Sequence, residues 1–384
     1  MNGPGAVLGR IEATRPWFGP EEVAAVTDVI ASGWLAQGPR VAQFEEEFAD
    51  AQQAGFAVAA SSGSAALHLA LAAVGVGPGD DVVVPSSSLS ATADAVARVG
   101  ARPIFADVDA VTGTLTGAHV AAALTPRTRA VIAVDVDGIP VDLDDVRLVC
   151  DPVDVVVVED AADGAGARYR GRPVGAGAEI AAWSFHPHAL LTTGEGGMVT
   201  TVRPEWAARA RRLRGDAASA AAAERHTGVP TTTQEHPEAA FGYRMTDLQA
   251  AVGLAQLGRL REVVARRRAV AAAYTQQIAG IPALRPVQDP PWGTSNGQAY
   301  RVEVQDGFPL DRDGLLAHLA HAGVAARRGA TAAHREPSYA GSAHVPLPVT
   351  ERLADSTLVL PAHQHLTEAD QDRVVEALRV AARG

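Results

Sequence analysis

Short apolar runs alternate with segments of helical periodicity through the first half of the chain. The apolar runs lie at residues 81–85, 103–107, 129–135 and 155–159. Helical patterns such as those at 91–99 and 116–124 separate them. Repeated strand–helix–strand units predict an α/β fold with a mostly parallel sheet between helices, and with sites at the carboxyl ends of the strands.

Later in the chain, one long amphipathic helix leads into a shorter series of elements. The segment 246–249, Thr-Asp-Leu-Gln, has the pattern of a capping box and opens a helix that we expect to extend to about Tyr274. Further elements are predicted at 301–304, 311–322 and 368–382. We therefore predict a large domain with an N-terminal segment over residues 1–250, and a linking helix with a small C-terminal domain over 251–384.

The composition restricts the classes of partner and compartment. A chain of 384 residues with 47% hydrophobic and 20% charged residues can bury a large core. Its net charge of -11 argues against nucleic acid and anionic membranes as partners, because both bind basic surfaces. No apolar run approaches the length of a membrane span, and the N-terminus does not resemble a signal peptide, so we predict a cytoplasmic protein. The single cysteine, Cys150, leaves no disulfide framework or cysteine-based metal site, and we expect it to be packed in the core.

The basic residues have an unusual composition. All 33 Lys or Arg positions are arginine, so the chain contains no lysine. The codon preference of a GC-rich genome accounts for the general pattern. Its chemical consequence is the same whatever the cause, because arginine stays protonated and does not form a Schiff base. No side chain of this protein can therefore hold an aldehyde cofactor in that way.

The stretch 183–201 has the character of a functional site. An apolar strand end leads into a loop with His186 and His188, and a glycine-rich segment, Gly-Glu-Gly-Gly at 194–197, precedes a β-prone end. Such glycines allow backbone or a ligand to approach closely.

A second candidate is the helix start at Gly63-Ser64-Ala65, which follows a short predicted strand at 56–59. The free N–H groups and the positive end of the helix dipole suit a phosphate group. Most Ser-Gly helix starts are only caps, so this motif by itself is weak evidence.

The segment 184–197, Ser-Phe-His-Pro-His-Ala-Leu-Leu-Thr-Thr-Gly-Glu-Gly-Gly, resembles the cofactor-lysine segment of the DegT-type (StrS-like) sugar aminotransferases. These are fold-type I enzymes that depend on pyridoxal 5'-phosphate (PLP). Further similar segments follow in the family's order, at 44–48, 76–82, 159–162, 243–251 and 360–361. The resemblance implies a fold-type I architecture with a smaller C-terminal α+β domain, a small-molecule substrate, and a homodimer with active sites at the subunit interface. The family's lysine falls on Ala189.

The resemblance also implies a set of cofactor-binding residues. Gly63, Ser64 and Ala65 match the segment that binds the cofactor phosphate, and Ser184 matches a hydroxyl that contacts it. Asp160 matches the carboxylate that pairs with the pyridinium nitrogen and makes the ring an electron sink.

Other pocket positions depart from the family. Asp163 stands where a Gln normally lies beside the phenolic oxygen, and Leu89 stands where an aromatic residue stacks on the ring. Gly242 replaces an Asn that reaches the phosphate from the neighbouring subunit. Together with Ala189, these changes favour a natural lysine-free member over a single engineered Lys-to-Ala change made to trap a substrate.

Histidines beside position 189 are the candidates for remaining chemistry. A dehydratase branch of the family, acting on 4-keto-6-deoxy sugars, has histidine at the lysine position and holds its cofactor non-covalently. Here His188 is adjacent to that position and is our candidate base, with Asp163 or Glu195 to orient it. His186 matches a histidine common in ordinary members, so a structural role competes with a catalytic one. The catalytic candidates are therefore His188, Asp163 and His186.

Three hypotheses stay open. In the first, PLP or pyridoxamine phosphate (PMP) is bound non-covalently and the enzyme carries out dehydration or a related proton transfer on a keto-sugar, an aminocyclitol or a natural-product intermediate. In the second, the pocket works by acid–base chemistry without a cofactor. In the third, the chain is a non-catalytic binding or partner protein. The chain as written excludes ordinary transamination through a lysine Schiff base, and we expect no metal.

Overall fold

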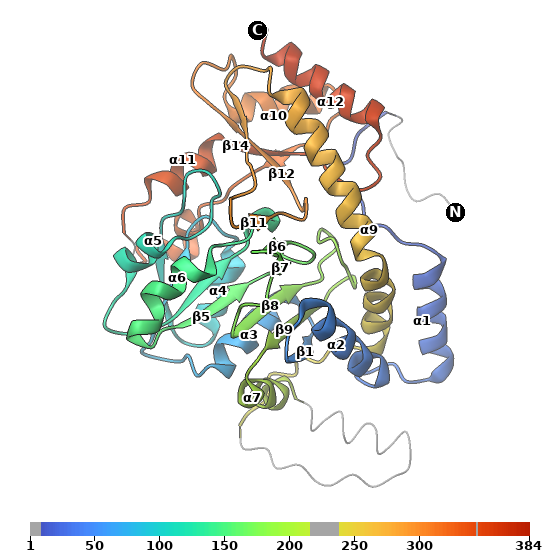
Figure 1. Ribbon diagram of the computed structural model, residues 1–384, viewed down its shortest axis with the longest axis vertical. Helices are drawn as coiled ribbons and strands as arrows, with labels where there is room; N and C mark the ends of the chain where they lie inside the picture. Colours follow the sequence, from blue (N-terminus) through green and yellow to red (C-terminus); the bar gives the residue numbers. More distant parts are fainter. Residues whose placement is uncertain (1–8, 216–237, 343–344) are drawn as a thin grey trace.

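The computed structural model describes residues 9–215, 238–342 and 345–384. Its centre is a seven-stranded sheet (Figure 1). In order across the sheet, the strands are β1 (Phe56–Ala60), β9 (Gly197–Thr201), β8 (Ile180–Ser184), β5 (Val156–Asp160), β4 (Thr128–Val134), β2 (Asp81–Pro85) and β3 (Arg102–Ala106). The strands from β8 to β3 run parallel, whereas β9 is antiparallel to both of its neighbours. The predicted α/β class with a mostly parallel sheet is confirmed.

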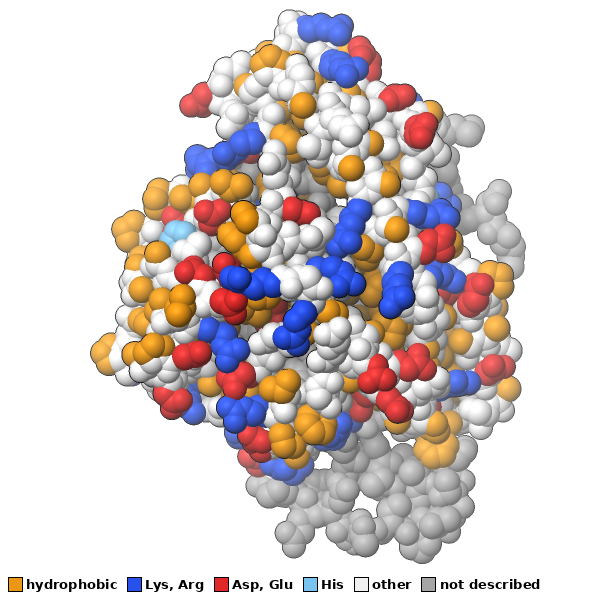
Figure 2. Space-filling model, in the orientation of Figure 1, with side chains coloured by type: hydrophobic (Ala, Val, Ile, Leu, Met, Phe, Trp, Pro, Cys, Tyr) orange, Lys and Arg blue, Asp and Glu red, His pale blue; other side chains and the backbone are white. Residues whose placement is uncertain are grey.

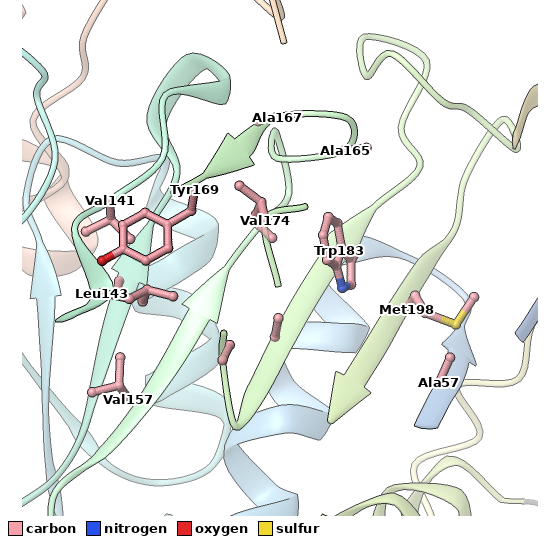
Figure 3. Packing of buried hydrophobic residues seen from close by; sticks show 14 of the residues in the cluster. Ala57, Val141, Leu143, Val157, Ala165, Ala167, Tyr169, Val174, Trp183 and Met198 are labelled. Atoms are coloured by element: carbon pink, nitrogen blue, oxygen red, sulfur yellow. The ribbon is translucent and has the colours of Figure 1, made fainter. Parts of the chain in front are cut away.

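Helices cover both faces of this sheet because its strands are apolar on both sides. One face packs against α3 (Gly63–Ala73), α4 (Ser90–Arg98) and α7 (Pro204–Arg214). The other packs against α2 (Pro39–Gln52), α5 (Gly117–Ala123) and α6 (Leu143–Cys150). On this second face, Trp183 of β8 and Val174 belong to one buried cluster (Figure 3).

The long helix α9 (Asp247–Ile278) connects this core to a second sheet (Figure 1). The predicted capping box is confirmed: the Thr246 hydroxyl accepts the Gln249 N–H at 3.2 Å, and the Gln249 side chain accepts the Thr246 N–H at 2.9 Å. The helix ends four residues beyond our prediction. Its second half packs with the sheet of β10 (Leu284–Pro286), β12 (Tyr300–Val304), β14 (Thr357–Leu360) and β13 (Arg327–Arg328), and with α10 (Arg312–His321) and α12 (Glu368–Ala381). The division at residue 250 stays a prediction.

Smaller elements complete the described chain. These are α1 (Pro20–Ser32), α11 (Pro348–Ser356), the short sheet of β11 (Gly293–Thr294), β6 (Arg168–Tyr169) and β7 (Arg172–Pro173), and 3-10 turns at Val136–Gly138, Asp151–Val153, Ala333–Arg335 and Pro337–Tyr339. The β11 segment precedes β12 in sequence, yet it pairs with β6 from the first half of the chain. This pairing brings the 289–298 segment against the turn that follows β5.

The surface mixes charges of both signs. Acidic and arginine side chains are interspersed with apolar ones on the face shown in Figure 2. Among the described helices, none is long and apolar enough to cross a membrane. The described residues contain no group of three or more His, Cys, Asp or Glu side chains arranged to hold a metal ion. Cys150 is buried, as predicted, and burial raises the pKa of its thiol to about 12.

Candidate active site

A closed loop between β8 and β9 carries position 189. The Phe185 carbonyl accepts the Thr193 N–H at 3.0 Å, and the Phe185 N–H donates to the Gly196 carbonyl at 2.9 Å. A side chain at Gly197 would overlap the Ser62 carbonyl, since strand β9 begins directly against the start of α3. The glycine-rich segment thus permits the close backbone approach that we expected from it.

The start of α3 lies beside Ser184 at the end of β8. The Ser62 hydroxyl accepts the Ala65 N–H at 3.1 Å and so caps the helix. A Cβ atom at Gly63 would lie only 2.6 Å from Cβ and Oγ of Ser184. The absence of a side chain at Gly63 therefore lets the start of α3 lie directly against Ser184, and we call this junction the cradle. Such a cradle, at the positive end of a helix, suits a phosphate group.

Asp160 ends β5 and is only 7% exposed. Its carboxylate accepts the Thr92 hydroxyl at 3.2 Å and the Ala162 N–H at 3.2 Å. Burial raises the pKa of Asp160 to about 6, and the two hydrogen bonds oppose this rise. A protonated ring nitrogen beside this carboxylate would relieve the cost of burying its charge.

Asp163 lies on the turn that follows β5. The Asn296 side chain, which is fully buried, holds this turn by donating to the Asp163 carbonyl at 2.6 Å and to the Ala165 carbonyl at 2.9 Å. Burial and the neighbouring carboxylates of Asp137 and Asp160 raise the pKa of Asp163 to about 7. Near neutral pH, Asp163 is therefore divided between the ionised form and a neutral form that can donate a hydrogen bond.

The two loop histidines contact one another at the surface of the site. Their rings are T-shaped with centroids 4.9 Å apart, and His186 Nδ1 accepts the His188 N–H at 3.3 Å. His186 Nε2 lies 3.9 Å from a Glu195 oxygen, so Glu195 is placed beside His186 and not beside His188. Partial burial lowers the pKa of His188, and the charges of His186 and Arg327 lower it further. His188 is therefore held in the neutral form that a base requires.

Residues from distant parts of the chain also reach this region, and sequence reasoning missed them. Gln298 donates to the His188 carbonyl at 3.0 Å, and Arg327 of β13 acts electrostatically on both His188 and Asp163. Gln298 and Asn296 follow β11 in a Pro- and Gly-rich connector. The polar cluster Ser-Asn-Gly-Gln at 295–298 was the available signal, but its spacing does not indicate which loop it contacts.

The two other positions that differ from the family's pattern, Leu89 and Gly242, lie on the exposed surface. Leu89, at the start of α4, is 69% exposed. Gly242 has φ of 72°, and a Cβ there would meet no described atom within 4 Å. Because Asn adopts positive φ more readily than other side chains, this backbone would accept the Asn that Gly242 replaces.

The fold is that of the PLP-dependent aminotransferases. Residues 17–379 match the model of the DegT/DnrJ/EryC1/StrS aminotransferase family, and the chain belongs to this family. It is similar to the aminotransferase TlmJ from Streptoalloteichus hindustanus, with 35% identity, a TM-score of 0.87, and coverage of 97% of this chain and 98% of that one.

Two further solved structures are similar over nearly their whole length. S. venezuelae DesV is 34% identical, with a TM-score of 0.87, and the match covers 98% of this chain and 99% of that one. Spr1654 from Streptococcus pneumoniae, whose PMP form has been solved, is 25% identical, with a TM-score of 0.88 and coverage of 97% and 98%. A PLP form of Spr1654 is also known.

The residues present fit this cofactor in part. The cradle at Gly63 and Ser184 suits its phosphate, and the buried Asp160 suits its ring nitrogen. Ala189 and the absence of lysine exclude a Schiff base to a side chain. The site therefore fits a cofactor held without a covalent bond.

Proposed function

We propose that this chain binds PMP or PLP non-covalently and carries out acid–base chemistry, either dehydration or a related proton transfer. Its substrate is a keto-sugar, an aminocyclitol or a natural-product intermediate. The observation that carries the proposal is the intact phosphate cradle and buried Asp160 around a position where lysine is replaced by Ala189. A pocket that had lost all use of the cofactor would have no need for this cradle.

Five residues would hold the cofactor. The backbone at Gly63, Ser64 and Ala65 and the Ser184 hydroxyl bind the phosphate, and Asp160 pairs with the ring nitrogen. When bound, the cofactor supplies an electron sink for the charge left by removing a proton from a substrate carbon.

The proton transfers fall to His188 and Asp163. Neutral His188 accepts a proton, because its lowered pKa keeps the imidazole uncharged. Asp163 donates a proton in its neutral form, and its raised pKa places that form within reach of neutral pH. His186 orients the loop through its contacts with the His188 backbone and with Glu195.

A second copy of the chain would complete the site. Among the large apolar side chains exposed on the described surface are Leu35 at 48%, Leu89 at 69% and Phe241 at 40%. Leu89 stands at one of the pocket positions that the resemblance implies, and Phe241 is adjacent to another, Gly242, where the family's Asn reaches the neighbouring subunit's site. We propose a homodimer that covers these side chains, and the cytoplasmic location stays a prediction.

The direct test is retention of the cofactor. Purified protein incubated with PMP and then desalted is expected to keep the PMP absorbance, whereas Asp160→Asn protein loses it. Complete loss from the wild type would overturn cofactor binding. Desalted wild-type protein that still converts a keto-sugar would then support chemistry without a cofactor, and an inactive dimer would support a partner protein.

The pH dependence of stability tests the state of Asp163. A carboxyl whose pKa is higher in the folded state than in the unfolded state stabilises the fold fully at pH values below its unfolded-state pKa. This contribution is lost as the pH rises through the folded-state pKa of about 7. Asp163→Asn is therefore expected to reduce the fall in the free energy of unfolding between pH 5 and pH 8 by about 1–2 kcal/mol. Denaturant titrations at both pH values measure this, with Asp28→Asn on the exposed surface of α1 as control. An identical fall in Asp163→Asn and wild type would show that Asp163 is ionised throughout.

A further inference from the structure

A pair of acids lies buried beneath the turn that carries Asp163. Glu159 in β5 is 0% exposed, and Asp135, just after the neighbouring strand β4, is 1% exposed. Successive residues of a strand point to opposite faces, so Glu159 and Asp160 lie on opposite sides of the sheet. The backbone connects the two sides, because the Asp135 N–H donates to the Asp160 carbonyl at 3.0 Å.

Hydrogen-bond donors are unevenly distributed among these acids. Asp160 accepts two, from Thr92 and Ala162, whereas Asp135 accepts one, from the Val141 N–H at 2.9 Å. Within the described residues, the second oxygen of Asp135 and both carboxyl oxygens of Glu159 have no donor. An ionised carboxylate without donors in the core is very costly, so these two acids need a proton.

The surroundings supply no cation for the pair. Across the described part of the chain, no arginine or histidine forms an ion pair with Asp135 or Glu159. Arg301 pairs with Asp137 at 3.1 Å, and the charges of Arg267 and Arg327 act on Asp163 instead. On the other side, a Cβ at Gly164 would lie 3.0 Å from the donor-free oxygen of Asp135, so the turn closes directly over the pair.

The directions of the pKa shifts agree with this lack of hydrogen-bond donors and cations around the two acids. Burial raises the pKa of Glu159 to about 8, and burial together with the charges of Glu159, Asp160 and Asp163 raises the pKa of Asp135 well above its usual range. Both shifts favour the protonated forms of the two acids.

We propose that Asp135 and Glu159 form a positioning pair that stays uncharged at neutral pH, so that Asp160 is the first carboxyl of the cluster to ionise. Four acids packed this closely cannot all be charged. The negative charge then lies on Asp160 at the end of β5, because this acid accepts the most hydrogen bonds. The consequence for a ring nitrogen rests on the proposed function, but the protonation of the pair does not.

The double variant Asp135→Asn/Glu159→Gln tests the pair, because the two amides have the shape of the acids and are permanently neutral. Infrared spectra of the ligand-free protein at pH 7 are expected to show a larger protonated-carboxyl signal in the wild type than in the variant, where the contribution of Asp163 remains. Asp160→Asn is the matched control and should retain that signal. If the variant lost no such signal, the pair would be ionised and the proposal would be wrong. If the double variant does not fold, the single variant Asp135→Asn is measured in the same way.

Binding of PMP gives a readout that a merely structural pair would not affect. At pH 7 the double variant is expected to bind PMP within about twofold of the wild type. Between pH 7 and pH 9 the wild type should lose affinity as Glu159 ionises, and the variant should lose less. An equal loss in both would overturn the role of the pair. If the wild type binds no PMP, the proposed function fails while the infrared result still decides the protonation of the pair.

Discussion

Ala189→Lys protein treated with PLP and borohydride is expected to gain one pyridoxyl group on residue 189, whereas no side chain of the wild type gains one. The wild-type chain has no lysine, and arginine does not form a reducible Schiff base. Position 189 is partly exposed on a loop that is closed by the hydrogen bonds of the Phe185 backbone, which accepts from Thr193 and donates to Gly196. Mass spectrometry of peptides from the reduced protein measures the modification.

Ala189→Arg is the matched control, since it adds a charge of the same sign without an amine that can react. A modified arginine variant, or an unmodified lysine variant that still retains PLP, would contradict the placement of the cofactor beside position 189. The lysine variant also separates two explanations of the sequence. Full transamination restored by this one change would favour a lysine replaced to trap substrate, and a covalent link without transamination would favour the repurposed enzyme.

Gly63→Ala is expected to weaken PMP retention by at least about tenfold and to lower the free energy of unfolding by about 1–3 kcal/mol. The added methyl group would lie 2.6 Å from Ser184 and would fill the cradle at the start of α3. Strand β8 or the start of the helix would have to move, because Cβ of Ser184 is fixed to the backbone and a rotation of the hydroxyl alone cannot relieve the contact. Equilibrium dialysis with PMP and denaturant titration measure the two effects.

Gly177→Ala serves as the control for a glycine without this constraint. A Cβ at Gly177 meets no described atom within 4 Å, so both PMP retention and stability should stay close to wild type. Gly63→Ala protein that loses stability but retains PMP normally would show that the phosphate lies elsewhere. In that case the start of α3 would be only a packed helix cap.

The local patterns of the site were visible in the sequence. Gly63 and Ser184 each sit where a strand meets a loop or helix, and a short stretch of chain is enough to recognise such a junction. The contacts of Asn296, Gln298 and Arg327 were not visible, because they join residues more than one hundred positions apart. The sequence left open whether Asp163 or Glu195 orients His188, and the loop turns Glu195 toward His186.

By itself, the sequence determined the parallel α/β core, through apolar runs that must be buried on both faces, and excluded a lysine Schiff base, through its composition. The tertiary structure decided how the pKa values of the acids in the site differ. Asp135, Glu159, Asp160 and Asp163 are the same kind of residue in sequence, and only burial, donors and neighbouring charges distinguish them. These quantities depend on what the fold places around each carboxyl, so no local pattern contains them.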